Sequence, residues 1–150
     1  MLENAKYRVR AARPSDDEAL AEIFRASRLE AFHRCETEDF FLSDFADQTQ
    51  GEVIHVAESP DGTLAGFVSV WEPESFVHHL FIDPRFHRQG IGKLLLRSLE
   101  TWLPFPHELK CLVANQRAAA FYAAMGWREI DRGSDPFGAY LVMSLERPIA

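Results

Sequence analysis

Long hydrophobic runs are absent from this chain of 150 residues. The aliphatic run beside its glycine turn, Leu94–Leu96, is far too short to cross a bilayer. The segment Met1–Arg10 is interrupted by charged side chains and lacks the apolar core of a secretory signal. We therefore expect a cytoplasmic protein that has no membrane partner.

Positive charge is also scarce, because 16 lysines and arginines stand against 23 aspartates and glutamates and leave a formal net charge of −7. Binding to phosphate backbones draws on clustered basic side chains, so we expect no nucleic-acid partner. Negative charge suits a cationic substrate, although the same charge equally serves solubility.

Cysteine is limited to Cys35 and Cys111, which lie far apart in the sequence. Two distant thiols form neither a disulfide framework nor the spaced clusters of a zinc site. We expect buried thiols in a reducing compartment and no bound metal.

The pattern of apolar residues predicts one α/β (α+β) domain over residues 1–150. Tyr7–Ala11 alternates as a strand does, and Ser15 is expected to cap a helix that runs to about Ala31. A mixed sheet with helices on both faces follows from the order of the remaining elements. Further strands are expected over Val53–Glu58, Leu64–Trp71, Phe76–Ile82, Leu109–Ala114, Trp127–Asp131 and Tyr140–Glu146, and further helices over Glu38–Asp47, Gly90–Leu103 and Arg117–Met125.

The most informative segment joins the strand Phe76–Ile82 to the helix that starts at Gly90. The strand stops near Pro84, and Arg88–Lys93 then reads RQGIGK. Unpaired N–H groups at a helix start, aided by the helix dipole, attract anions, and glycines let a phosphate approach the backbone. The alternative is a turn in which Gly90 and Gly92 only ease packing.

Two common phosphate motifs are excluded by single positions. A P-loop needs glycine and Ser or Thr where this chain has His87 and Leu94. A dinucleotide fingerprint needs a third glycine where Leu95 stands, and an acidic residue roughly where Lys110 stands. Any anion site at Gly90 is therefore of another type.

A second motif lies downstream, over Asn115–Trp127, which reads NQRAAAFYAAMGW. Together the two motifs, in this order and at this separation, resemble the GCN5-related N-acetyltransferase (GNAT) family. The resemblance covers about residues 7–146 and is most specific over 77–127. It implies a mostly antiparallel sheet in one N-acetyltransferase domain.

The resemblance also implies how the chain would bind acetyl-coenzyme A. Backbone groups of Leu80–Ile82 would pair with the pantetheine arm like an added strand, and the following loop would wrap the pyrophosphate. His87 fills a position that is Arg or Gln in the family, a small departure because the loop acts through its backbone. The implied cofactor-binding residues are Leu80, Phe81, Ile82, His87, Arg88, Gln89, Gly90, Ile91, Gly92, Lys93, Asn115 and Phe121.

The activity that the resemblance implies is transfer of acetyl from acetyl-coenzyme A to a primary amine by direct attack. Tyr122 would protonate the departing thiolate, and the acceptor would be a small molecule or a peptide. The sequence leaves two other functions open, a non-catalytic module that senses acyl-coenzyme A and a structural subunit. It also leaves open whether the chain forms a homodimer.

The base that removes the amine proton is less determined by the sequence. Lys110 occupies the place where some relatives carry a glutamate, so that assignment fails. Glu72, just past a strand, is our candidate base, and His79 or a water relay are alternatives. His78 and His79 are neighbours on a strand and should point to opposite faces, which disfavours a metal site.

Overall fold

The computed structural model describes residues 6–31 and 44–148. Its centre is a seven-stranded sheet with the strand order β1-β2-β3-β4-β5-β7-β6. Neighbouring strands are antiparallel except for β4 and β5, so the predicted mixed, mostly antiparallel sheet is confirmed. The strands are β1 (Arg8–Ala11), β2 (Val53–Glu58), β3 (Leu64–Trp71), β4 (Phe76–Ile82), β5 (His107–Leu112), β6 (Arg128–Asp135) and β7 (Gly138–Leu145).

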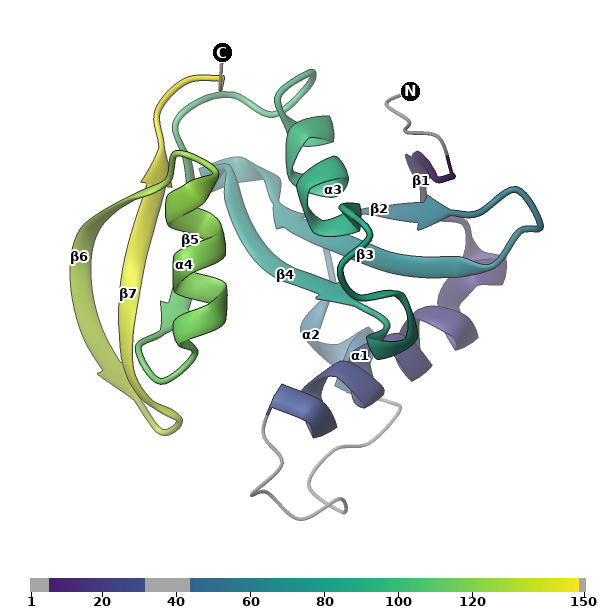
Figure 1. The fold of residues 1–150 in the computed structure, drawn as a ribbon, viewed down its shortest axis with the longest axis horizontal. Helices are drawn as coiled ribbons and strands as arrows, with labels where there is room; N and C mark the ends of the chain where they lie inside the picture. Colours follow the sequence, from purple (N-terminus) through teal and green to yellow (C-terminus); the bar gives the residue numbers. More distant parts are fainter. Residues whose placement is uncertain (1–5, 32–43, 149–150) are drawn as a thin grey trace.

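Helices cover both faces of the sheet, as the element order predicts (Figure 1). The helix α3 buries Leu95 and Leu99 against one face, and α1 buries Leu20 and Phe24 against the other. Each such side chain contributes about 1.5–3 kcal/mol when it is fully buried. The helices are α1 (Asp17–Ala31), α2 (Asp44–Gln48), α3 (Ile91–Leu99) and α4 (Gln116–Ala124).

Several element bounds differ from the sequence-based expectation. The helix α3 ends at Leu99, and the next residues form turns in which the N–H of Leu103 still bonds to the carbonyl of Leu99 at 2.8 Å. The last hairpin is longer than predicted because β6 continues to Asp135. Of the helical region expected over Glu38–Asp47, residues 38–43 lie outside the described part of the chain.

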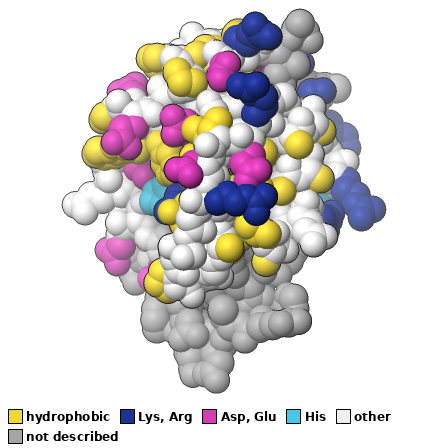
Figure 2. Space-filling view, turned by 90° about the vertical axis from the view of Figure 1, so that its left-hand side faces the viewer, with side chains coloured by type: hydrophobic (Ala, Val, Ile, Leu, Met, Phe, Trp, Pro, Cys, Tyr) yellow, Lys and Arg dark blue, Asp and Glu magenta, His cyan; other side chains and the backbone are white. Residues whose placement is uncertain are grey.

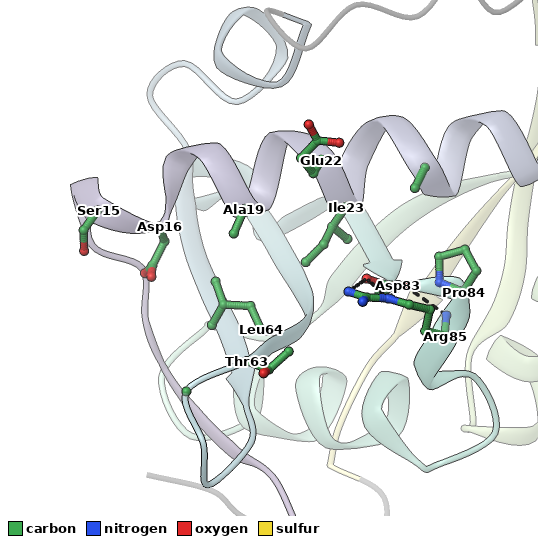
Figure 3. Close-up of a pocket in the computed structure, with 12 residues that line it drawn as sticks. Ser15, Asp16, Ala19, Glu22, Ile23, Thr63, Leu64, Asp83, Pro84 and Arg85 are labelled. Atoms are coloured by element: carbon green, nitrogen blue, oxygen red, sulfur yellow. Dashed lines mark hydrogen bonds and ion pairs between the residues drawn. The ribbon is translucent and has the colours of Figure 1, made fainter.

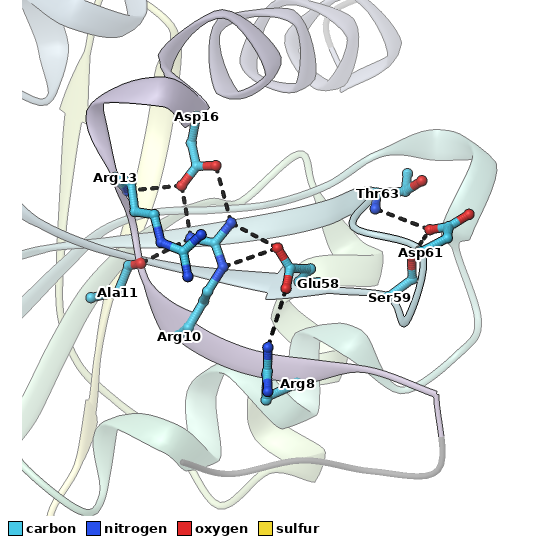
Figure 4. Close-up of polar contacts among 9 residues, drawn as sticks. All are labelled: Arg8, Arg10, Ala11, Arg13, Asp16, Glu58, Ser59, Asp61 and Thr63. Atoms are coloured by element: carbon cyan, nitrogen blue, oxygen red, sulfur yellow. Dashed lines mark hydrogen bonds and ion pairs between the residues drawn. The ribbon is translucent and has the colours of Figure 1, made fainter.

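The start of α1 is built differently from the expected Ser15 cap. Pro14–Asp16 forms a 3₁₀ turn, and the carboxylate of Asp16 accepts a hydrogen bond from the N–H of Arg13 at 2.8 Å. Asp16 also pairs with Arg10, whose guanidinium reaches Glu58 as well, both at 2.8 Å (Figure 4). This buried network ties the first strand to the first helix and to β2.

Breaking this network is expected to destabilise the protein. Asp16→Asn removes one of the two charged partners of Arg10, whose side chain is only 9% exposed, and should cost about 3 kcal/mol of unfolding free energy. Urea denaturation measures this cost. The control Glu146→Gln breaks an exposed pair with Arg128 and should cost less than about 1 kcal/mol. Equal costs for the two variants would contradict a stabilising role of the network.

The same network gives the stability a definite pH dependence. Hydrogen bonds from Arg10 lower the pKa of both Asp16 and Glu58 below their ordinary values. Their contribution is therefore complete above the unfolded pKa of about 4, and it is lost as the pH falls through the lower folded pKa. Asp16→Asn should flatten this acid dependence.

The strand β4 contains a bulge that overturns one expectation. Ser69 pairs with His79 but Val70 pairs with Val77, so His78 is an extra residue on β4. A bulge breaks the strict alternation of side chains. As a result His78 and His79 do not point to opposite faces: their ring centroids lie 3.9 Å apart.

The strands β4 and β5 separate soon after they begin. They pair only at Phe76 with Glu108 and at Val77 with Leu109, and the gap between them widens beyond that point (Figure 1). The second half of β4 therefore has an edge that no strand covers, and α3 and α4 flank it on one face.

None of the helices in the described residues has the length and hydropathy of a membrane-spanning segment.

Candidate active site

A cavity of about 590 Å³ lies where the open edge of β4 meets the start of α3 and one side of α4. Both sequence motifs contribute to its wall, although the rest of α3, the strand β5 and the turns on either side of that strand separate them. Its lining contains Ser27, Leu80, Phe81, Ile82, Phe86, His87, Arg88, Gly90, Ile91, Gly92, Lys93, Asn115, Arg117, Ala118, Phe121 and Tyr122.

The start of α3 presents its N–H groups without a side-chain cap. Gly90 is the residue before the helix and has a φ of +76°, a left-handed conformation that favours glycine. A Cβ atom at Gly90 would meet nothing within 4 Å, so this position opens to space. Unpaired amides and the helix dipole together make this end of α3 suitable for an anion.

Gly92 serves packing, which was the other explanation for this pair of glycines. A Cβ atom at Gly92 would lie 3.3 Å from Cζ of Phe121. A larger residue here would therefore push α4 away from α3. The two glycines have different roles: Gly90 leaves the helix start open, and Gly92 brings the second motif against the first.

The loop before α3 is held by contacts to other parts of the fold. Arg88 has a φ of +65°, an uncommon conformation for a residue with a side chain. His87 Nε2 lies 3.3 Å from the carbonyl oxygen of Ile82. Gln89 points away from the cavity lining and accepts a hydrogen bond from the hydroxyl of Tyr7 at 2.7 Å. Gln89 therefore acts as an anchor for the loop.

The open edge of β4 offers backbone groups at alternate residues. The N–H of Asp83 donates to the carbonyl of Ala65 on β3 at 2.8 Å. Hydrogen-bonding direction alternates along an antiparallel strand, so Phe81 also faces β3, whereas Leu80 and Ile82 face the open edge. Of the three residues predicted to pair with a ligand, Leu80 and Ile82 are therefore the two whose backbone groups face away from β3. The carbonyl of Ile82 already accepts from the hydroxyl of Ser27 at 3.2 Å.

Asn115 begins α4 as its cap. Its side-chain oxygen accepts a hydrogen bond from the N–H of Ala118 at 3.1 Å. This bond stabilises the first turn of α4, the helix on which Phe121 and Tyr122 reach the cavity wall. Because the cap uses only the oxygen, the amide N–H₂ of the same side chain can still donate to a ligand.

Tyr122 is half-buried in the cavity wall and packs on Trp127, with ring centroids 5.9 Å apart. Burial raises the pKa of its hydroxyl above the ordinary value, and the nearby Cys111 thiol adds to the rise. The hydroxyl therefore stays protonated at neutral pH and is a hydrogen-bond donor. This is the state that an acid needs before the reaction.

Glu72, the predicted base, does not line this cavity, and neither does the alternative base His79. Glu72 lies exposed in the 3₁₀ turn Glu72–Glu74, between β3 and the start of β4. The residues of β4 that line the cavity lie at the opposite end of the strand, from Leu80 to Ile82. The role of Glu72 as the base stays a prediction.

Four residues of the lining were not predicted. Phe86, Arg117 and Ala118 lie inside or beside the two motifs, so a wider window around each motif would have included them. Ser27 belongs to α1 and reaches Ile82 across 55 positions of sequence. No local pattern marks it, because its role depends on how α1 packs.

A second cavity, of about 690 Å³, lies between α1, the turn after β2 and the end of β4 (Figure 3). Its two buried acids are already paired, Asp83 with Arg85 at 2.8 Å and Asp16 with Arg10. No unpaired charge of these acids is left for a ligand. The first cavity is therefore the stronger candidate for a functional site.

The side of the molecule formed by β6 carries basic and acidic side chains interspersed (Figure 2). Arg128 pairs with Glu146 at 2.9 Å, and Arg132 pairs with Glu129. Such a face lacks the continuous positive charge of a phosphate-binding surface.

Comparison with protein families places the chain in a known class. The model of the acetyltransferase (GNAT) family matches residues 18–127, a stretch that contains both motifs and all the residues that line the cavity. The chain belongs to this family. The resemblance drawn from the two motifs is thereby confirmed.

Individual relatives resemble the chain over different lengths. Peptidyl-lysine N-acetyltransferase YiaC of Escherichia coli is 39% identical over 72 residues, and the match spans 47% of each protein, about half the length of that relative. A GCN5-related N-acetyltransferase from Rhodopseudomonas palustris has a TM-score of 0.78 at 20% identity and covers 97% of this chain and 99% of its own. The PaiA N-acetyltransferase of Thermoplasma acidophilum, solved with coenzyme A, has a TM-score of 0.77 at 19% identity over 93% of this chain and 98% of its own.

Proposed function

We propose that this chain, as one domain over residues 1–150, transfers acetyl from acetyl-coenzyme A to a primary amine. One observation carries the proposal: the open start of α3, the open edge of β4 and the hydroxyl-bearing Tyr122 share one cavity. An anion site, a strand-like binding edge and an acid are the three elements that a thioester of a diphosphate carrier requires.

The chemistry of the lining suits this cosubstrate. The amides at Gly90 and the positive charges of Arg88 and Lys93 suit a pyrophosphate. The open backbone groups of Leu80 and Ile82 suit the amides of a pantetheine arm. Acetyl-coenzyme A would supply an activated thioester at the end of that arm.

Aminolysis of a thioester requires a neutral amine, a polarised carbonyl and a protonated leaving sulfur. A backbone N–H on the open edge of β4, near Ile82, would polarise the carbonyl. As the nitrogen–carbon bond forms and the carbon–sulfur bond breaks, the electron pair goes to sulfur and Tyr122 donates its proton there. Tyr122 then regains a proton from water, and attack is direct, without an acyl-enzyme.

Removal of the amine proton requires a base, because a primary amine with a pKa of about 10.4 is mostly charged at neutral pH. Glu72 could serve only through intervening water, since it is exposed and outside the cavity lining. The acceptor is a primary amine on a small molecule or a peptide. The name of the relative YiaC, a peptidyl-lysine acetyltransferase, supports the peptide class.

The buried, free thiol of Cys111 supports a cytoplasmic location, because reducing compartments keep such thiols unpaired. The alternative function, a module that senses acyl-coenzyme A without turnover, would need the binding groups but no acid. The position of Tyr122 in the cavity wall favours catalysis over sensing.

Acetyl-coenzyme A is expected to raise the melting temperature. A ligand that binds only the folded state adds about 2.7 kcal/mol at a concentration of 100 Kd, which corresponds to about 5–10 °C for a protein of this size. Thermal denaturation with and without the ligand measures the shift. Absence of a shift at millimolar ligand would contradict the proposed site. A shift without thiol release for any amine class would favour the sensing module.

A further inference from the structure

Outside the cavity lining, a carboxylate lies within hydrogen-bonding distance of a histidine, an arrangement that can orient the histidine as a base. His78 Nδ1 lies 2.5 Å from Oε2 of Glu52, the residue that precedes β2. The carboxylate side chain is only 6% exposed, whereas the histidine side chain is 41% exposed. In the neutral tautomer that donates Nδ1–H to Glu52, the lone pair of Nε2 faces outward, where a substrate can reach it.

The position of this pair along β4 relates it to the reaction. Val77 is the last residue of β4 that pairs with β5, so His78 stands at the point where the two strands separate. The anion-binding start of α3 follows the opposite end of β4. A donor that is anchored at Gly90 and lies along Ile82 and Leu80 therefore directs its acyl end toward His78.

The bulge determines which face of the sheet receives this pair. Ser69 and Phe67 of β3 face α1, and His79 packs on Phe24 of that helix with ring centroids 5.0 Å apart. His78 stacks on His79, so it faces the same side. Tyr122 belongs to the cluster on the other face, the one covered by α3 and α4. The gap between β4 and β5 thus has an acid on one face and the Glu52–His78 pair on the other.

We infer that His78, positioned by Glu52, is the catalytic base for the acceptor amine; the inference rests on the proposed function. Nε2 of His78 accepts the proton that leaves the amine nitrogen, while that nitrogen bonds to the acetyl carbon. The carbon–sulfur bond breaks, and sulfur takes its proton from Tyr122 on the opposite face. Water then takes the proton from His78 and returns one to Tyr122, so transfer to a neutral amine releases no net proton. A protonated amine releases one, which it loses to water before the attack.

Glu52 orients this histidine. Its oxygen Oε2 lies 2.5 Å from Nδ1 of His78. Its other oxygen, Oε1, is buried, has no hydrogen-bond partner among the described residues, and lies 3.8 Å from Nδ1 of His79. The carboxylate therefore holds the ring of His78 by one hydrogen bond and leaves the other ring nitrogen available.

His79 is the less suitable base. Its side chain is 8% exposed, and its Nδ1 lies 2.9 Å from the hydroxyl of Ser69. Burial, with the nearby His78 and Arg28, lowers the pKa of His79 to about 3. His79 therefore stays neutral and acts as the wall on which His78 stacks.

A metal is a poorer explanation of the same cluster. Glu52, His78 and His79 offer ligand atoms within 4.8 Å of one another. The two imidazole rings, however, lie against each other, with 31° between their planes. Lone pairs lie in the ring plane, so rings this close to parallel point them in similar directions, which does not favour a shared ion.

Other charged groups on this face are few in the described part of the chain. Arg28 of α1 is paired with Asp44 of α2 at 3.1 Å. Glu108 and Lys110 of β5 share this face because the residues between and after them are buried on the other. Lys110 lies over the ring of Tyr140, with Nζ 4.3 Å from its centroid. Glu52 is thus the acid in direct contact with His78.

The test replaces the histidine and records the rate against pH. His78→Gln should lower kcat by about 10²-fold at neutral pH and remove the acid-side fall of kcat/KM, while acetyl-coenzyme A still raises the melting temperature. The matched control is His55→Gln, which changes a β2 histidine that stacks on Trp102 and should leave the rate and its pH profile unchanged. An unchanged pH profile in His78→Gln would overturn the inference.

A second readout does not depend on activity. In nitrogen NMR spectra of the ligand-free protein, neutral His78 should carry its proton on Nδ1, and Glu52→Gln should shift this proton toward Nε2, because an amide can donate to Nδ1. Detection of the Nε2–H tautomer in the wild type would also overturn the inference. If the wild type acetylates no amine, the proposed function fails while the tautomer result still reports on the pair.

Discussion

Replacing Tyr122 by phenylalanine is expected to lower kcat by about 10²-fold or more while the binding of acetyl-coenzyme A is unchanged. The substitution removes one hydroxyl and keeps the ring that packs on Phe121 and Trp127, so the cavity wall should hold its shape. Because burial keeps the hydroxyl protonated, its loss removes the proton that the departing sulfur needs. Steady-state kinetics with a saturating amine measure the change.

The control for this variant is Tyr140→Phe. Tyr140 lies on β7 outside the cavity lining, so its hydroxyl should make no difference to turnover. Thermal shifts with acetyl-coenzyme A should be equal in the wild type and in both variants. Full turnover in Tyr122→Phe would remove this residue from the role of the acid, and water would have to protonate the sulfur.

Replacing Gly90 by valine is expected to abolish the thermal shift that acetyl-coenzyme A produces. A side chain at this position enters open space at the start of α3, where the pyrophosphate is proposed to bind. Its φ of +76° is also unfavourable for valine, so the backbone that presents the amides would distort. Both effects act on the same anion site.

Backbone strain and loss of the site can be separated with Gly62→Val. Gly62 lies in the turn between β2 and β3, has a φ of +88°, and would likewise place its Cβ in open space. The cost of about 1–2 kcal/mol for a left-handed valine should be similar in both variants. Only Gly90→Val should lose the shift. Loss of the thermal shift in both variants would show that backbone strain alone explains the result.

The predicted residues that the structure brings into one cavity lie mostly on segments in which neighbours in sequence are neighbours in space. Gly90, Gly92 and the residues around them lie on one strand-to-helix connection, and Phe121 lies on one helix turn with Tyr122. Spacing along a single element is visible in a sequence. The meeting of the two motifs was implied by the family resemblance, and the packing of Gly92 on Phe121 is a contact between them.

The parts that escaped prediction depend on register and on distant segments. The bulge at His78 leaves no trace in the sequence, since a single extra residue in a strand changes pairing without changing composition. Glu52 contacts His78 across 26 positions, and Arg10 contacts Glu58 across 48. Such pairs appear only when the sheet is assembled.

The separation of β4 from β5 has a mechanical consequence. In the described part of the chain, the pairing between the strand blocks β1–β4 and β5–β7 is a short seam over Ser75–Val77. A carrier molecule seated against Leu80 and Ile82 would fill the wedge beyond that seam and brace one block against the other. The bound donor would then add contacts between the two strand blocks, and these contacts would be lost when the product leaves.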